Sequence, residues 1–85
     1  LEIVKALKDF EQAKQDVRSY RELLREAVSN FDQAYGEYRV GKGDILTVLQ
    51  TERDLARAKE NLVVALYAAN NSLANVERRA YLTDK

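Results

Sequence analysis

Three residues of this chain have the spacing of a phosphate-binding loop. Gly36, Gly41 and Lys42 match the G-x-x-x-x-G-K part of that motif, in which backbone N–H groups and a lysine hold the phosphates of a nucleotide. The match ends at the next residue, because Gly43 stands where the motif needs a serine or threonine to bind magnesium. The glycines also follow a predicted helix and not a strand. We therefore expect no nucleotide site and no cofactor.

The remaining reactive residue types form no catalytic set. The chain has no histidine, cysteine or methionine, so disulfides, thiolate metal sites and imidazole bases are excluded. Ser19, Ser29 and Ser72 have no base near them, and the carboxylates alternate with basic residues on predicted solvent faces. We expect no enzymatic activity and no metal site.

The charge balance argues against two further kinds of partner. Fourteen basic and fourteen acidic residues give a formal net charge of zero. No summed field would therefore draw the chain to nucleic acid or to an anionic membrane. The uncharged run over residues 61–75 is too short for a membrane span and contains Asn70, Asn71, Ser72 and Asn75. We expect neither nucleic-acid binding nor entry of this chain into a membrane.

Two long heptad repeats must position all of these residues. With 46% apolar, 33% charged and 8% aromatic residues among 85, the chain has the composition of a coiled coil. The first repeat has apolar residues at every a and d position: Ile3, Ala6, Phe10, Ala13, Val17, Tyr20, Leu24, Ala27, Phe31, Ala34 and Tyr38. The second, less pure, consists of Val48, Thr51, Leu55, Ala58, Leu62, Ala65, Ala69, Ser72 and Val76. Such sustained repeats predict coiled-coil helices.

The two repeats meet at the only cluster of helix breakers. All three glycines lie within residues 36–43, and the chain has no proline. If the chain reverses at Gly41, facing residues have numbers that add up to 82, and most layers pair a large residue with a small one. These pairs are Leu24–Ala58, Ala27–Leu55, Ala34–Val48, Phe10–Ser72, Ala6–Val76 and Val17–Ala65. We predict an all-α fold, a single long antiparallel two-helix coiled-coil hairpin over residues 1–85. Its helices should cover about 2–39 and 44–82, with a tip at about 40–43 and arms of roughly 55 to 60 Å.

A hairpin of this length needs partners, because one seam between two helices buries little apolar surface. From Asn61 to Asn75 no residue is charged, and apolar residues extend beyond the seam. A helix that is apolar on several sides is buried on several sides. The lateral packing candidates are therefore Val63, Leu66 and Leu73, either in a wider bundle core or against neighbouring hairpins. Since the chain opens within a helix, we also expect it to be a fragment of a longer protein.

The tip has sequence signals of its own. Gly41 can adopt the left-handed conformation that ends a helix, and Gly43 is expected to loosen the connection. Asp44 is a natural N-cap for a helix that begins at Ile45, although Thr47 stands where a capping box has Glu or Gln. The partner-binding candidates at the tip are Tyr38, Arg39, Val40, Gly41, Lys42, Gly43 and Asp44.

The residues around this turn resemble the helical hairpin of TolC-type outer-membrane efflux proteins. The run from Tyr38 to Gln50 is similar to that family's pattern, which reads roughly Y-x-x-G-x-x-x-x-L-x-V-L. The similarity continues through Glu52-Arg53-Asp54-Leu55, Ala58, Leu62, Ala65 and Tyr67, and it covers about residues 20–76. The spacing of Tyr, Gly, Leu and Val-Leu at the turn is more specific than the heptads alone.

The resemblance implies a role in a tripartite multidrug efflux system. Such proteins are trimers of the Gram-negative outer membrane, and each protomer contributes two hairpins to a periplasmic tunnel, where neighbouring hairpins pack together. The tips close the inner end of the tunnel and dock with the hairpins of a periplasmic adaptor protein. By this resemblance Tyr38 is a gate candidate and Gly41 lies at the adaptor contact. Thr47 and Gln50 stand where some members carry the acidic residues that ring the pore. Neither is acidic here, and this departure from the family puts such a ring in doubt.

Two alternatives remain beside this interpretation. A periplasmic adaptor also contains a long antiparallel hairpin, but its tip usually carries an Arg, Leu and Ser arrangement, whereas Arg39 is followed here by Val40 and Gly41. The other alternative is a structural coiled-coil spacer, as in a cytoskeletal or phage protein. Binding to an adaptor hairpin that depends on Gly41 would separate the efflux hypothesis from the spacer.

Overall fold

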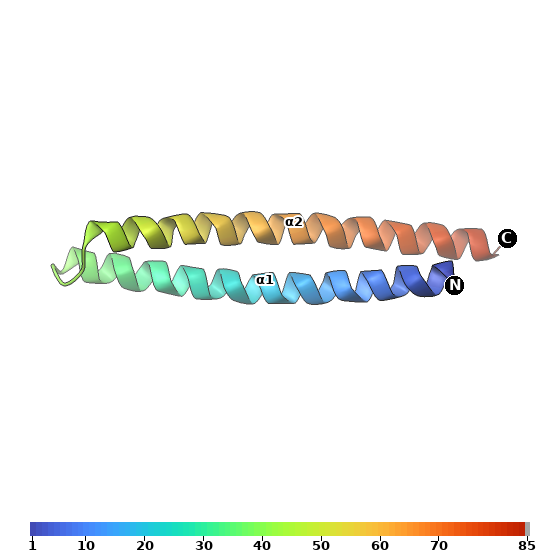
Figure 1. Ribbon diagram of the computed structural model, residues 1–85, viewed down its shortest axis with the longest axis horizontal. Helices are drawn as coiled ribbons and strands as arrows, with labels where there is room; N and C mark the ends of the chain where they lie inside the picture. Colours follow the sequence, from blue (N-terminus) through green and yellow to red (C-terminus); the bar gives the residue numbers. More distant parts are fainter. Residues whose placement is uncertain (85) are drawn as a thin grey trace.

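Two helices lie antiparallel and side by side in the computed structural model (Figure 1). The structure describes the backbone of residues 1–84 and the side chains of residues 1–82. Helix α1 spans Glu2–Arg39 and helix α2 spans Ile45–Asp84. The hairpin measures 67 × 13 × 13 Å. Both termini lie at one end, which we call the open end, and the connection forms the tip at the other (Figure 1). The all-α antiparallel hairpin predicted from the heptads is confirmed.

The predicted heptad rows form the seam between the helices. In α1 every a and d residue from Ile3 to Ala34 is buried or half-buried, and the same holds in α2 for the rows that begin at Val48 and Thr51. The most deeply buried residues are all alanine or valine: Ala6, Ala13, Val17, Ala27, Ala34, Val48 and Ala65. Small residues at the centre of the seam let the helices approach closely. They also make the apolar core thin, because alanine and valine contribute little area to it.

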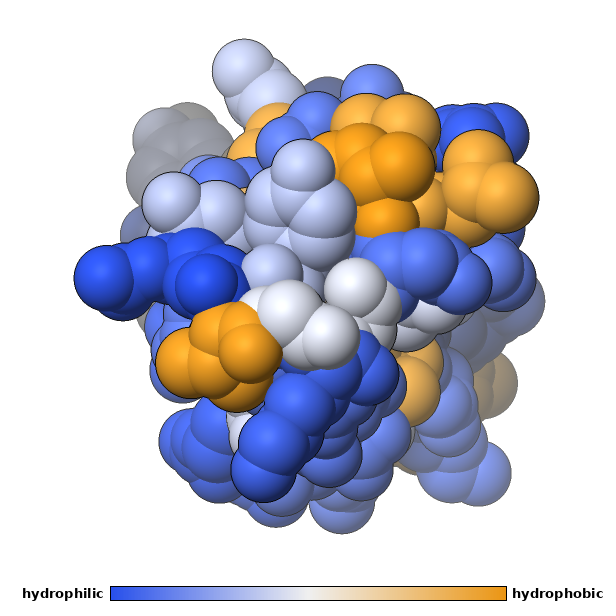
Figure 2. Space-filling view, turned by 90° about the vertical axis from the view of Figure 1, so that its left-hand side faces the viewer, coloured by the Kyte–Doolittle hydropathy of each residue, from blue (hydrophilic) through white to orange (hydrophobic). Residues whose placement is uncertain are grey.

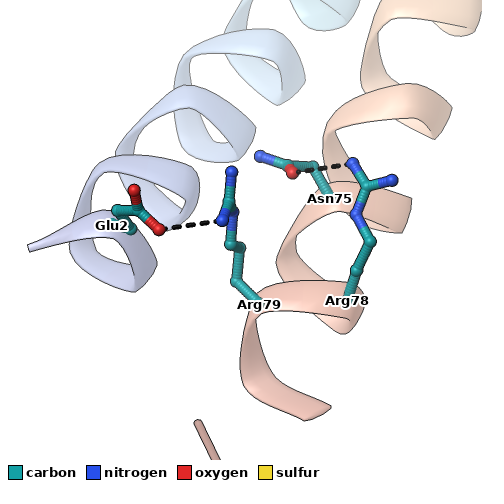
Figure 3. A network of polar contacts seen from close by, with 4 residues as sticks. All are labelled: Glu2, Asn75, Arg78 and Arg79. Carbon is teal, nitrogen blue, oxygen red and sulfur yellow. Dashed lines mark hydrogen bonds and ion pairs between the residues drawn. The ribbon is translucent and has the colours of Figure 1, made fainter. Parts of the chain in front are cut away.

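Contacts at both ends of the seam show how the helices are aligned. Near the open end, Arg79 Nη1 donates a hydrogen bond to Glu2 Oε2 at 2.8 Å (Figure 3). A reversal at residue 41 would place residue 80, the neighbour of Arg79, opposite Glu2. Near the tip, Ala34 lines a groove with Thr47 and Thr51, the neighbours of its expected partner. Both contacts are consistent with the predicted alignment.

Two successive arginines of α2 behave differently at the open end. Figure 3 shows Arg79, which continues the d row, reaching across the seam to α1. Arg78 stays over its own helix, where its Nη2 donates to Asn75 Oδ1 at 3.2 Å (Figure 3). A charged residue at a seam position thus ties the two helix ends together through its long side chain.

Tyr38 departs from the predicted seam. It continues the a row of α1 in the sequence, yet its side chain is 42% exposed. The reason is that α2 begins only at Ile45, so the helix that would cover Tyr38 has not started at this height. Tyr38 therefore belongs to the surface of the tip and not to the core.

Candidate protein-interaction surfaces

Helix α1 ends in a turn that backbone hydrogen bonds hold in place. The N–H of Gly41 donates to the carbonyl of Tyr38 at 3.1 Å, and the N–H of Lys42 donates to the carbonyl of Glu37 at 2.8 Å. This pair of bonds is the Schellman arrangement that commonly ends a helix. Gly41 has a φ of +80°, so the predicted left-handed conformation is confirmed. The direction in which the chain leaves α1 is therefore fixed.

Gly43 does not loosen the connection, so that part of the prediction is wrong. Its N–H donates to the same Glu37 carbonyl at 3.1 Å. A Cβ at this position would lie 3.2 Å from the Cβ of Glu37 and 3.4 Å from the backbone nitrogen of Tyr38. The loop folds back onto the last turn of α1, and a glycine permits this close approach. The tip is consequently a packed turn.

Asp44 starts α2 as its N-cap, as the sequence predicted. The N–H of Thr47 donates to Asp44 Oδ1 at 2.8 Å. This bond, followed by a bond from the Thr47 hydroxyl, lowers the pKa of the Asp44 carboxyl below its ordinary value; desolvation opposes this effect, and a weaker bond from the N–H of Leu46 adds to it. The carboxylate also lies at the positive end of the helix dipole. Both helix ends at the tip are thus held by specific polar contacts.

The tip presents apolar side chains to solvent. Val40 is 69% exposed and Leu46 is 72% exposed, and Ile45 and Leu49 are exposed as well. Seen end-on, the tip shows a hydrophobic cluster on one side and a separate hydrophobic patch on the other, with hydrophilic residues around them (Figure 2). All of the predicted tip residues 38–44 are exposed except Gly43, which is half-buried. Exposed apolar residues on a fixed turn are typical of a protein-binding site.

A stack of side chains lies along α1 just below the tip. The rings of Phe31 and Tyr35 are parallel to within 8°, with their centroids 6.0 Å apart. The guanidinium carbon of Arg39 lies 5.8 Å from the centre of the Tyr35 ring. The stack was not predicted from the sequence, although the spacing of four residues between its members is a signal for it. It keeps the charge of Arg39 beside the turn.

Of the three predicted gate residues, Thr47 and Gln50 lie about one turn apart on the same side of α2, whereas Tyr38 lies in the last turn of α1. Thr47 lines a groove with Gln33 and Glu37 of α1, whereas Gln50 lines another with Leu46 and Arg53, on the outer side of α2. Tyr38 lines neither of these grooves.

The seam divides the remaining surface into two flanks. In an antiparallel coiled coil, the e and b positions of both helices lie on one side of the seam, and the g and c positions lie on the other. Grooves along the seam show this arrangement by joining residues of both helices: Lys14, Arg21, Leu66 and Leu73 on one side, and Leu23, Asn30, Asp54 and Asn61 on the other. The two flanks can therefore be described separately.

The flank formed by the e and b positions carries more exposed large hydrophobic residues than the opposite flank. We call it the apolar flank; its members of this kind are Val4, Leu7, Val28, Tyr35, Ile45, Leu49, Val63, Leu66 and Leu73. The opposite flank, formed by the g and c positions, has Leu23, Val64 and Leu82 among the described helical residues. The predicted lateral packing residues Val63, Leu66 and Leu73 thus all lie exposed on the same flank.

Charge separates the two flanks as well. On the flank opposite the apolar one, which we call the acidic flank, Glu2, Asp9, Asp16, Glu26, Glu37 and Asp54 outnumber Lys5, Arg57 and Arg78. On the apolar flank, basic residues outnumber acidic ones: Lys14, Arg18, Arg21, Arg25, Arg39 and Lys59 against Glu11, Asp32, Glu52 and Glu77. The net charge of zero therefore conceals opposite charges on the two sides of the seam.

The described part of the chain has neither a metal site nor an unsatisfied buried polar side chain. There, no group of three or more His, Cys, Asp or Glu residues could hold a metal ion, and no buried side-chain nitrogen or oxygen lacks a hydrogen-bond partner. Within residues 1–84, neither helix combines the length and the hydropathy of a membrane span. The surfaces that could recognise a partner are the tip and the two flanks.

No protein-family model, curated protein or solved structure matches this chain.

Proposed function

We propose that this chain is a periplasmic tunnel hairpin of a TolC-type outer-membrane efflux protein, and that its tip docks with the hairpin of a periplasmic adaptor protein. The proposal starts from the run Tyr38 to Gln50, which resembles the turn of that family. The observation that supports it best is the tip itself, where a turn held by backbone hydrogen bonds exposes Val40 and Leu46.

Docking at the tip is favoured by the rigidity of the turn. A surface that already has its bound shape loses less conformational entropy when a partner binds. The Schellman bonds fix the end of α1, the close approach of Gly43 fixes the loop, and the Asp44 cap fixes the start of α2. A structural spacer needs a reversal of the chain, but it has no need for apolar residues exposed at that reversal.

The flanks support packing between hairpins in a tunnel wall. The fully buried residues of the seam are alanine and valine, and the larger seam residues are only half-buried, while Val63, Leu66 and Leu73 stay exposed on the apolar flank. Neighbouring hairpins of the trimeric parent protein would cover these residues and supply the missing burial. Tyr38, Thr47 and Gln50 are the proposed gate residues. Since none of them is acidic, such a gate would act by narrowing and by polar side chains.

Capture of an adaptor hairpin by the immobilised chain tests the docking. Gly41→Glu adds a long charged side chain to the tip, and we expect it to abolish capture. Gly36→Glu is the matched control, because Gly36 also has open space around its Cβ position but lies on the outer face of α1. Because any side chain at a φ of +80° is strained, Lys42→Glu provides a second tip variant that leaves Gly41 unchanged.

The expected pattern is capture by the unmodified hairpin and by Gly36→Glu, with clear loss in both tip variants. Circular dichroism of each variant shows whether the helices are intact. Absence of capture by the unmodified hairpin, or capture that ignores both tip variants, would refute the docking and favour the spacer.

A further inference from the structure

We propose that Arg39 is a specificity-determining residue of the tip and that it binds a carboxylate of the docking partner. The inference rests on the proposed docking at the tip, and it adds the chemistry that the partner must supply, which is an acidic side chain beside an apolar hairpin tip. Three features lead to it: the charges around the turn, the rings that position Arg39, and the small size of the tip.

The basic and the acidic residues around the turn differ in their contacts within the chain. Both carboxylates already accept hydrogen bonds: Asp44 Oδ1 from a backbone N–H of α2 at 2.8 Å, and Glu37 Oε1 from Gln33 Nε2 at 3.2 Å. No ion pair in the described part of the chain includes Arg39 or Lys42. The formal charges cancel, but the cations are free to bind a partner whereas the carboxylates are engaged. The tip therefore favours an anionic group on the partner.

A column of rings on α1 positions Arg39. The Phe31 and Tyr35 rings are stacked, and the Arg39 guanidinium carbon lies 5.8 Å from the centre of the Tyr35 ring. The three residues are four apart in the sequence, so they follow one another along one face of the helix up to the turn. Phe31 is half-buried in the seam and anchors the base of the column. A guanidinium held over a ring loses less conformational entropy when it binds a carboxylate.

Exposed apolar residues beside Arg39 make its contact with a partner selective. Val40 follows Arg39 in the chain, and Ile45 and Leu49 lie on the same flank; all three are exposed. A partner that covers these residues also removes the guanidinium from water. A carboxylate at this place compensates for the lost water with two charge-assisted hydrogen bonds. A partner without one leaves a buried, unpaired cation, which disfavours its binding.

The small size of the tip makes single contacts important. The hairpin is 13 × 13 Å in cross-section, so a flat tip presents roughly 170 Å², whereas a standard interface buries roughly 800 Å² on each partner. Binding over so small an area depends on a few strong contacts. Arginine and tyrosine are enriched among the residues that contribute most to protein interfaces. The loss of Arg39 should therefore be measurable in the affinity for the partner.

Stabilisation of α1 is the alternative role for Arg39. This residue is the last one of α1, where a positive charge interacts favourably with the helix dipole. Lysine supplies the same charge, but it lacks the planar fork that binds a carboxylate through two hydrogen bonds. Arg39→Lys therefore keeps the interaction with the dipole and loses the bidentate contact, so it separates the two roles.

The affinity of the hairpin for an adaptor hairpin, measured by biolayer interferometry at two salt concentrations, tests the inference. We expect Arg39→Gln to weaken binding about tenfold at low salt, which corresponds to about 1.4 kcal/mol, and to make the affinity less dependent on salt. Arg39→Lys should recover only part of this loss. The matched control is Arg18→Gln, which removes the same charge from the same heptad position far from the tip and breaks no ion pair in the described part of the chain. It should leave binding unchanged.

Substitutions of Tyr35 test the positioning of Arg39. Tyr35→Leu removes the ring and should weaken binding about threefold, whereas Tyr35→Phe keeps the ring and should bind like the unmodified hairpin. In the Arg39→Gln background, Tyr35→Leu should have no further effect, because the ring acts through the guanidinium. An equal loss in both backgrounds would refute the positioning role. Circular dichroism of each variant shows whether the helices are intact.

Exchange of charges between the two partners tests the carboxylate. Each aspartate and glutamate near the adaptor tip is replaced in turn by arginine, and one of these variants should restore binding to Arg39→Glu. Three results would overturn the inference while the docking stands: equal effects of Arg39→Gln and Arg18→Gln, full binding by Arg39→Lys, or no adaptor variant that restores binding to Arg39→Glu. An unmodified hairpin that does not bind the adaptor refutes the docking, and the inference falls with it.

Discussion

An exchange of the large and small residues in one layer tests whether the helices pack in the proposed alignment. Val17 of α1 and Ala65 of α2 are both buried, with 8% and 6% of their surface exposed. A reversal at residue 41 places them opposite each other, and Val17 lines a groove with Leu66, the neighbour of Ala65. The perturbation consists of Val17→Ala, Ala65→Val and the double variant that carries both. The double variant keeps the volume of the layer and only exchanges its sides.

The magnitudes follow from the burial of this layer. Val17→Ala removes two carbon atoms from the seam and leaves a void, which should cost about 1.5 to 2.5 kcal/mol in the free energy of unfolding. Ala65→Val forces extra volume between closely packed helices and should cost about 1 to 3 kcal/mol. A volume-conserving exchange usually costs less than about 1.5 kcal/mol. The double variant should therefore be more stable than the sum of the two single effects predicts, by about 1 kcal/mol or more.

Urea unfolding followed by circular dichroism gives these free energies, at a protein concentration where the hairpin is monomeric. Val64→Ala and Ala68→Val are matched controls on the same helix, because both positions are exposed. Each should change the free energy of unfolding by less than about 1 kcal/mol. If the two single effects simply add in the double variant, Val17 and Ala65 do not share a layer. The alignment of the helices would then be wrong.

Three further predictions concern the ends of the hairpin. Gly41→Ala should destabilise the fold by about 1 kcal/mol, because the φ of Gly41 is +80°. Gly36→Ala should stabilise the fold by up to about 1 kcal/mol, because Gly36 lies in a helix and has open space around it. Equal effects of the two substitutions in thermal unfolding would contradict the turn geometry. The Asp44 carboxyl has a lower pKa in the folded state, so its contribution to stability is full at neutral pH and is lost as the pH falls through the acidic range where this carboxyl takes up a proton. Asp44→Asn should therefore make the melting temperature less dependent on pH on the acid side. An unchanged slope would show that the cap does not titrate. Glu2→Gln removes the exposed ion pair with Arg79 and should lower the free energy of unfolding by less than about 1 kcal/mol, and only at low salt. A larger loss in thermal unfolding that persists at high salt would mean that this contact contributes more than an exposed ion pair.

The heptad rows were predictable because burial in a coiled coil follows directly from the repeat of seven. Each predicted a and d residue from Ile3 to Ala34 and from Val48 to Val76 is buried or half-buried. The turn was predictable for a similar reason, since Gly41 and Asp44 occupy positions that a helix end and a helix start require. Local rules fixed these features, so no knowledge of distant contacts was needed.

The features that escaped prediction depend on how the two helices meet. Tyr38 fits the a row, but no helix faces it because α2 starts too late. Gly43 was expected to add freedom, but the loop packs against Glu37 and needs the space. The charged residues of α1 outside the seam were interpreted as a solvent face, because their division into two unlike flanks emerges only when both helices are placed together.

Mapping of the adaptor contact by nuclear magnetic resonance tests the central claim most directly. The hairpin, labelled with nitrogen-15, is titrated with the hairpin of a periplasmic adaptor protein, and the backbone amide shifts are followed residue by residue. The docking proposal predicts shift changes that are concentrated in residues 38–49, around the exposed Val40 and Leu46. Shifts that stay unchanged throughout, or that change along the flanks while the tip is silent, would contradict it.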